Sequence, residues 1–408
     1  MGLLGICFAL AVALALSSDR SRLRWSIVGW GLGLQLVFGI LVLRTPVGTL
    51  FESFGVVFRR FVDMAEDGSA LVFGDLGRSE NGVVFAFQIL PLIIVVSSLS
   101  AILYHLGLMP RLVGAIAVVM QRGMRASGAE SLNVAANLFI GQAEAPLTIR
   151  PYLDKLTRSE LMTVMTGGMA TVSGAILVAY VQIGGASAEN LLTALVMTAP
   201  TCIMMAKIFE PETGVPQTLG HVPKLSSEED KNVIEAASRG ASEGLSVALQ
   251  VAAMLIAFVA LIAVVNGILG ATQTALAWPW FPSSIQDLLG PLLAPVAWLL
   301  GVPWQDATVV GNLLGTRIVL NEFISYAELA TIKDTLRPDS FLIANYALCG
   351  FANLGSVGIQ IGALGAMLPG RRGELAEIGF RAMIAATLSN FTTAATAGLI
   401  AFTPLLNP

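Results

Sequence analysis

Eight apolar segments of membrane-spanning length constrain this 408-residue chain more than any other feature of its sequence. A helix needs about 20 mostly apolar residues to cross the hydrocarbon core of a bilayer. Because lipid offers no hydrogen-bond partners to the backbone, such segments fold as helices. We therefore predict an all-α polytopic membrane protein with eight transmembrane helices. The predicted spans are 2–17, 25–44, 82–105, 160–184, 189–208, 240–268, 338–368 and 376–403.

The composition excludes several other classes of protein. Only 12% of the residues are charged and 55% are hydrophobic, whereas soluble domains carry about 25% charged residues. The net charge of −4 leaves no excess of cations for nucleic acid, which we exclude as a partner. Cys7, Cys202 and Cys349 stand singly, and His105 and His221 lie far apart, so we expect neither disulfides nor a cluster of metal ligands.

The distribution of basic residues predicts the orientation. Sixteen of the 23 lysines and arginines follow spans 1, 3, 5 and 7, and cytoplasmic connections carry the excess of basic residues. Both termini are therefore predicted to lie outside the cytoplasm. The longest polar stretch, 209–238, is predicted to be a cytoplasmic linker between two halves of the chain, with His221 solvated in it.

Four segments do not fit simple spans. Residues 127–157 and 304–334 are half-apolar, interrupted by polar residues and flanked by charge at both ends, which is typical of re-entrant hairpins. Broken backbone at membrane depth occurs where it lines a cavity, so these hairpins are predicted to form the working site. Residues 108–125 suit a helix on the cytoplasmic face. Residues 277–303, rich in tryptophan and proline, suit an amphipathic segment at the outer interface.

An internal repeat links the hairpins to the helices that follow them. Glu144 in the first hairpin precedes Gly-Met-Ala-Thr-Val-Ser-Gly at 168–174, and Glu322 in the second precedes Gly-Phe-Ala-Asn-Leu-Gly-Ser at 350–356. Thr171 follows Glu144 by 27 residues, and Asn353 follows Glu322 by 31. The two hairpins are predicted to open from opposite sides, which makes the repeats inverted, as in many secondary transporters.

The two carboxylates indicate a functional site. Each glutamate at bilayer depth costs roughly 2.5–3.5 kcal/mol on insertion scales unless it faces a polar cavity. Pairing with Arg317 or Arg150, or capping of a hairpin helix, would also account for them. Apart from Arg317 the predicted site has no fixed positive charge, so a neutral, polyhydroxylated ligand fits better than an anion.

Two functions other than transport by a carrier are considered. A membrane-embedded enzyme could use Glu144 and Glu322 as general acid and base on a lipid-linked substrate. The sequence argues against it, because there is no nucleophile with a neighbouring base and no histidine at the site. A passive channel is disfavoured because a closed, ligand-shaped site predicts saturable uptake.

The motifs around Asn137 and Gly141-Gln142-Ala143-Glu144-Ala145-Pro146, Asn321-Glu322-Phe323 and the two heptapeptides at 168 and 350 resemble the concentrative nucleoside transporter family, in its short bacterial form. The resemblance covers nearly the whole chain and implies a homotrimer in the bacterial inner membrane that works by an elevator-type movement. Spans 1, 2, 3 and 6 would form a scaffold, and both hairpins with spans 4, 5, 7 and 8 a transport domain. The corresponding segments are 1–105 (scaffold helices 1–3), 106–126 (cytoplasmic interfacial helix), 127–208 (first transport repeat), 209–238 (linker), 239–303 (scaffold helix 6 and outer amphipathic helix) and 304–408 (second transport repeat).

The resemblance also implies a site for each ligand. Gln142 and Glu144 would contact the nucleobase, Phe351 and Ile176 would pack around it, and Glu322, Asn353 and Ser356 would hold the ribose hydroxyls. Sodium would bind the side chains of Asn137 and Thr171 and the carbonyls of Ile140 and Val172, since oxygen ligands at a broken helix suit a hard cation. Ala143 stands where the family commonly has Thr or Ser, so the base preference is open. The function implied is sodium-coupled import of nucleosides, pyrimidine nucleosides such as uridine included, with proton coupling as the alternative.

Overall fold

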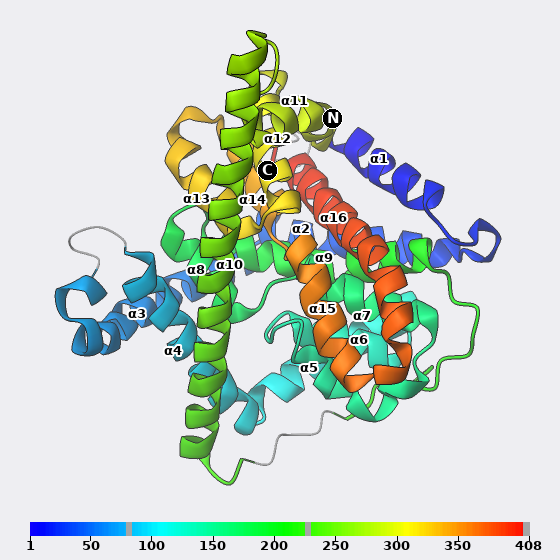
Figure 1. Ribbon diagram of the computed structural model, residues 1–408. Coiled ribbons are helices and arrows are strands. Elements are labelled where there is room, and N and C mark those ends of the chain that lie inside the picture. Colours follow the sequence, from blue (N-terminus) through cyan, green and yellow to red (C-terminus); the bar gives the residue numbers. More distant parts are fainter. Residues whose placement is uncertain (79–83, 225–229, 403–408) are drawn as a thin grey trace.

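The computed structural model describes residues 1–78, 84–224 and 230–402, and it confirms the all-α class. Within these ranges the chain forms α-helices and short 3-10 helices and no strand (Figure 1). Three predicted segments extend beyond the described residues: the beginning of the third span at 82–83, the linker at 225–229, and the end of the second repeat, eighth span included, at 403–408.

Helices lie at every predicted span. Six helices are long and apolar enough to cross a membrane, or up to seven if a strongly bent pair counts as one span, within the described part of the chain. The number of spans therefore stays a prediction, because α1 is short and the seventh predicted span consists of two helices that are each too short to cross a membrane. The span helices are α1 (Gly2–Ala15), α2 (Trp25–Arg44), α4 (Phe85–His105), α7 (Arg158–Ala170), α8 (Gly174–Ile183), α9 (Ala188–Phe209), α10 (Val233–Leu276), α14 (Pro338–Leu348), α15 (Leu354–Met367) and α16 (Arg372–Phe402).

Two predicted spans are discontinuous at matching places. The fourth breaks between α7 and α8, where Thr171 has extended backbone. The seventh breaks between α14 and α15, and Asn353 caps the second half by accepting a hydrogen bond from Ser356 N at 2.9 Å. Both breaks fall inside the repeated heptapeptides, so the repeat seen in the sequence marks where the helices open.

Both predicted hairpins are present. The first consists of α6 (Gly128–Asn137), a turn at 138–144 and the 3-10 helix η4 (Ala145–Lys155). The second consists of α12 (Trp304–Val319) and α13 (Glu322–Ile332), joined by only two residues. Ser127 and Glu130 form a capping box at the beginning of α6, so a short local motif begins the first hairpin.

The hairpins lie toward opposite ends of the long helix α10. In Figure 1, α12 and α13 lie near the upper, C-terminal part of α10, whereas α5 and α6 lie near its lower, N-terminal part. This arrangement agrees with the prediction of inverted repeats. The first hairpin lies at the end of the molecule where the linker approaches α10.

Helix α5 (Leu108–Met124) and helix α11 (Ile285–Leu300) occupy the two predicted interfacial segments. The buried residues of α5 recur at intervals of four and three, at 113, 117, 120 and 124, as on one face of an amphipathic helix. Helix α3 (Val47–Phe73) was not predicted. The predicted spans make residues 45–81 a connection, since the charged residues there keep the stretch from matching a span.

The linker is attached to the first hairpin over its described part. Gly128 N donates to Thr218 O at 3.0 Å, and Ala129 N donates to Thr218 Oγ1 at 2.9 Å. Lys207 lies buried beside it, with Nζ 2.8 Å from Glu130 Oε2 and 3.2 Å from Glu212 Oε2. These bonds fix the base of the first hairpin to the end of α9. His221 is exposed, as predicted.

Two helix groups surround the hairpins. Helices α4 and α10 pack along each other, whereas α1 and α2 pack against α9 and α16. Gln35 of α2 is completely buried and donates to Thr393 Oγ1 of α16 at 2.9 Å. The cavity described below lies between the first hairpin and the α4–α10 pair.

Candidate functional site

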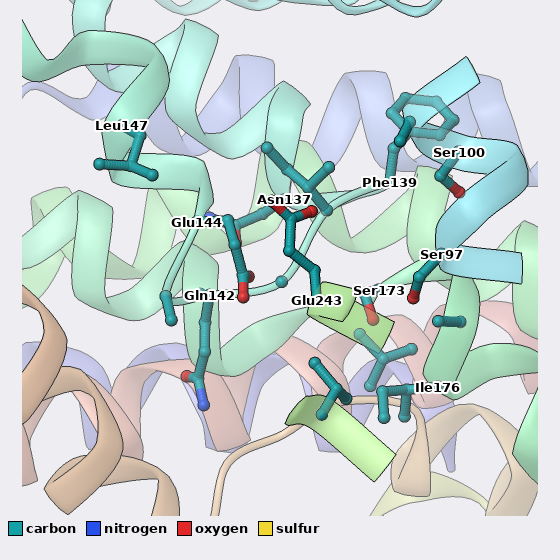
Figure 2. Close-up of a pocket in the computed structure, with 18 of the residues that line it drawn as sticks. Ser97, Ser100, Asn137, Phe139, Gln142, Glu144, Leu147, Ser173, Ile176 and Glu243 are labelled. Carbon is teal, nitrogen blue, oxygen red and sulfur yellow. The ribbon is translucent and has the colours of Figure 1, made fainter. Parts of the chain in front are cut away.

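A cavity of about 260 Å³ lies at the tip of the first hairpin. Its walls come from the hairpin tip, the break between α7 and α8, helices α4 and α10, and Phe351 at the other helix break. Figure 2 shows Gln142, Glu144 and Asn137 from the hairpin together with Glu243 from α10 around this space. The cavity extends to Asp230 and Arg239, so it reaches the linker end of the molecule.

The structure brings most of the predicted site residues to this one cavity. All four residues predicted for sodium line it, together with four of the seven predicted for the nucleoside. The residues that line it are Asn137, Ile140, Thr171, Val172, Gln142, Glu144, Ile176 and Phe351. The other three, Glu322, Asn353 and Ser356, are completely buried behind it.

The residues predicted for sodium lie at the ends of two short helices. Asn137 is the last residue of α6, and Thr171 follows the last residue of α7. Thr171 Oγ1 lies 3.5 Å from Asn137 O and donates to Gly167 O at 2.9 Å. Helix C-termini carry unpaired carbonyls and a partial negative charge, which suits a small cation. Within the described residues no group of three His, Cys, Asp or Glu could hold a metal, and the oxygens that Asn137 and Thr171 offer are neutral.

Glu322 is held in a network that joins the two repeats. Its carboxylate accepts from Tyr180 Oη at 2.7 Å and from Asn353 Nδ2 at 3.0 Å. Tyr180 stacks on Tyr326, with ring centroids 4.6 Å apart, and its edge contacts Phe323. These ring contacts hold the Tyr180 hydroxyl in position to donate to the Glu322 carboxylate.

Tyr180 was missed by the sequence analysis, and so was Gln360. Gln360 Nε2 of α15 donates to Gln142 Oε1 of the first hairpin at 3.1 Å. A Cβ at Gly168 would lie 1.9 Å from Gln360 Nε2, so a side chain there would displace the end of Gln360 from its hydrogen bond with Gln142. Each of these two residues lies in an apolar stretch of a helix. The neighbouring sequence does not show whether such a side chain binds a ligand or only packs in the core.

The alternative of an ion pair for the glutamates does not apply within the described residues. Arg317 donates to Gly350 O and to Asn390 Oδ1, not to a carboxylate, and Arg150 is exposed. No other side chain donates a hydrogen bond to Glu144 in the described part of the chain. The two glutamates therefore have different surroundings, one bonded and buried and one facing the cavity.

Charged residues line the linker end of the cavity. Arg239 donates two hydrogen bonds to Asp230, at 3.1 and 3.0 Å, and a third to Glu243 at 2.8 Å. The hydrogen bonds from Arg239 lower the pKa of Asp230. With Glu144 across the cavity, carboxylates outnumber the one arginine at this end. The linker end of the cavity therefore favours neutral or cationic solutes over anions.

Comparison with known proteins now identifies the family. Three family profiles match successive parts of the chain: "Na+ dependent nucleoside transporter N-terminus" at residues 4–76, "Nucleoside recognition" at 86–187, and "Na+ dependent nucleoside transporter C-terminus" at 190–398. The chain belongs to the Na+-dependent nucleoside transporter family. The resemblance found from the sequence motifs is confirmed.

Relatives of this family match over nearly the whole chain. A protein from Bacillus subtilis named uncharacterized transporter YutK is 40% identical over 98% of this chain and 98% of its own length. Sodium/nucleoside cotransporter 1 of Mus musculus is 39% identical over 97% of this chain. This chain spans only 63% of that mouse protein and 60% of human solute carrier family 28 member 3, so these relatives are longer.

Solved structures of CNTnw have the same fold. One described as inward-facing and substrate-bound aligns with a TM-score of 0.91 and 37% identity, over 98% of this chain and 96% of its own. A variant described as outward-facing aligns with the same TM-score of 0.91. Overall similarity is therefore the same to the inward-facing and the outward-facing structure.

The family decides between the functions weighed from the sequence. Its members are transporters, so the prediction that this multi-pass membrane protein is not an enzyme is confirmed. Sodium is the coupling ion of the family, as predicted.

Proposed function

We propose that this protein is a sodium-coupled symporter that imports nucleosides, pyrimidine nucleosides such as uridine among them. The observation that carries the proposal is that all four predicted cation residues and four of the seven predicted nucleoside residues line one cavity. In this proposal Gln142 and Glu144 bind the base, and Phe351 and Ile176 pack against it. Glu322, Asn353 and Ser356 bind the ribose, and Asn137, Ile140, Thr171 and Val172 supply oxygens to sodium.

The chemistry of the site supports a neutral, hydrogen-bonding cargo. The Glu322 carboxylate and the amides of Gln142 and Asn353 can pair with hydroxyl groups and with the edge of a base. The cavity has both apolar walls and polar groups at one end, which is typical of sites for small ligands. An anionic nucleotide would meet Glu144 and Glu243, which favours the uncharged nucleoside.

Sodium coupling is energetically sufficient for accumulation. One cation moving down a potential of about 100 mV releases ~2.3 kcal/mol. A tenfold sodium gradient adds ~1.4 kcal/mol. Because the nucleoside is uncharged, one sodium ion would permit accumulation of several hundred-fold.

The cavity supports an elevator-type cycle with the site facing the cytoplasm. It reaches the linker end of α10, and the distribution of basic residues predicts that end to be cytoplasmic. In this cycle the hairpins and the helices α7–α9 and α14–α16 carry the site past α4 and α10. Both termini would then be periplasmic.

We further propose a homotrimer in the bacterial inner membrane. Helix α10 exposes large apolar side chains along its length, with Ile256 74% exposed, Leu249 60% and Ile268 61%. A monomer in water would not tolerate such a surface. Lipid and the other subunits would cover it.

The proposal is tested by uptake of radiolabelled uridine into proteoliposomes of the purified protein. An inward sodium gradient is compared with potassium or choline at fixed pH. Saturable accumulation that requires sodium is expected. Uptake that ignores sodium and follows a pH gradient would move coupling to Glu144 or Glu322, and absence of uptake of any nucleoside would overturn the substrate assignment.

A further inference from the structure

Asn390 of α16 joins the two broken helices. Its Nδ2 donates to Ala170 O, at the last residue of α7, at 2.8 Å, and to Cys349 O, directly after α14, at 2.7 Å. Asn390 is completely buried. One amide group therefore connects two breaks that belong to different repeats.

Arg317 of α12 binds the oxygen of the Asn390 amide. Its Nη2 donates to Asn390 Oδ1 at 2.5 Å, and its Nε donates to Gly350 O at 3.2 Å. Because arginine can only donate, the oxygen of Asn390 must face it and the nitrogen must face the two carbonyls. One orientation of the Asn390 amide therefore pairs both its oxygen and its nitrogen, whereas Nη1 of Arg317 has no hydrogen-bond partner within the described residues.

The electrostatics of the network explain how a fully buried arginine is accommodated. Arg317 lies in the last turn of α12, and Asn390 connects it to the C-terminal ends of α7 and α14. A helix C-terminus carries about −0.5 of an elementary charge. Three such ends and the negative charge of Glu322 together offset the arginine, while the Glu322 carboxylate accepts its hydrogen bonds from Tyr180 and Asn353.

Gly350 brings the two breaks into contact. A Cβ at this position would lie 2.3 Å from Asn390 Oδ1 and 2.7 Å from Ala170 O, which no side chain can adopt. Thr171 and Val172 follow Ala170 directly, and Phe351 to Asn353 follow Gly350. The residues proposed for sodium and those proposed for the nucleoside are therefore attached to the two sides of one contact.

We infer that Asn390 and Arg317 are positioning residues that transmit cation binding at 171–172 to the nucleoside-binding groups at 351–353. This inference rests on the proposed function. Bound sodium would hold the backbone at the break after α7. The Asn390 amide and the Arg317 guanidinium would then hold the backbone at the break after α14. Nucleoside affinity then depends on sodium through these two side chains.

The test is the affinity for uridine as a function of sodium, measured by calorimetry on the purified full-length protein. In wild type we expect uridine binding to tighten about tenfold between 1 and 100 mM sodium, within the usual range of coupling between two sites. Asn390→Asp keeps the acceptor for Arg317 and places a second acceptor against the carbonyls of Ala170 and Cys349. We expect this variant to bind uridine with less than about a twofold dependence on sodium.

A matched control and a second variant make the outcome decisive. Thr392→Val removes a buried hydroxyl whose hydrogen bond lies within α16, to Leu388 O at 2.8 Å, and it should keep the dependence of wild type. Arg317→Lys keeps the charge but lacks the fork that reaches both Gly350 and Asn390, and it should reduce the dependence even if Asn390→Asp fails to fold. Full sodium dependence in the folded variants would overturn the inference. If the wild-type protein binds no nucleoside, the proposed function is overturned instead. The measurement on the wild type is enough to detect that outcome, so the two failures can be told apart.

Discussion

The two hairpins carry a glutamate at matching places but hold it in opposite ways. In the second hairpin two residues join regular helices, and Ser325 Oγ of one arm donates to Leu313 O of the other at 3.0 Å. Glu322 there is completely buried and accepts two side-chain hydrogen bonds. In the first hairpin the turn covers 138–144, the second arm is a 3-10 helix, and Glu144 faces the cavity.

This difference separates a rigid half of the site from an adaptable one. A buried carboxylate that accepts a hydrogen bond at each oxygen is held in place and keeps acceptor capacity for a ligand, and changing it leaves its partners without acceptors. A carboxylate on a longer turn can adjust to ligands of different shape. Under the proposed function the rigid half would bind the ribose, which all nucleosides share, and the adaptable half would bind the base, which varies.

Substitution of Glu322 is the strongest test of the difference between the two hairpins. Glu322→Gln replaces an acceptor of two hydrogen bonds by an amide that can accept at one atom only, and each bond to a charged group is worth about 1.5–3 kcal/mol. We expect kcat/KM for uridine uptake to fall by at least about 100-fold, with the melting temperature checked in parallel. Glu328→Gln, on the same helix, is the matched control, since Glu328 accepts from Asn312 Nδ2 away from the cavity. Wild-type affinity in Glu322→Gln would show that this carboxylate does not bind the cargo.

The cation side is tested at Thr171. Thr171→Val keeps the shape and removes the hydroxyl oxygen, so we expect the KM for sodium to rise about tenfold, with uridine KM unchanged at saturating sodium. Thr163→Val is the control, because Thr163 makes the same kind of bond within α7, to Ser159 O at 3.0 Å, outside the cavity. Equal effects of the two substitutions would remove Thr171 from the sodium site.

Tyr180 tests whether the rigidity of Glu322 matters. Tyr180→Phe removes one of the two donors to the carboxylate, worth about 1 kcal/mol, and we expect a roughly fivefold rise in the KM for uridine. Tyr326→Phe removes a hydroxyl that donates to Asn345 O at 2.8 Å, and it should leave the uridine KM nearly unchanged. If both variants behave alike, the effect belongs to packing of the stacked rings.

Ala143 gives the smallest expected effect and sharpens the view of the adaptable half. Ala143 lines the cavity next to Glu144, and Ala143→Ser adds a hydroxyl within reach of a bound base. We expect the KM for uridine to fall by about two- to fivefold. Competition by purine and pyrimidine nucleosides before and after the change measures base preference. Unchanged KM values for every nucleoside would mean that this position does not contact the base.

Local patterns were enough to predict much of the fold and the location of the site. The apolar segments, the hairpins and the repeated heptapeptides follow from the requirement that backbone groups be satisfied in lipid. The capping residues Ser127 and Asn353 begin helices for reasons contained in a few neighbouring residues. Helix α3 was not predicted, although its apolar and charged residues recur with helical periodicity as clearly as those of α5.

The sequence by itself determined the membrane class, the two repeats and the glutamates and polar residues within them, because each depends on composition or on short spacings. Only the tertiary structure decided which of these residues share a cavity and which are buried behind it. It also added Tyr180, Gln360 and Asn390, whose partners lie in the other repeat. Long-range hydrogen bonds of this kind leave no local signal, since a polar residue in an apolar helix has the same neighbours in sequence whatever it meets across the fold.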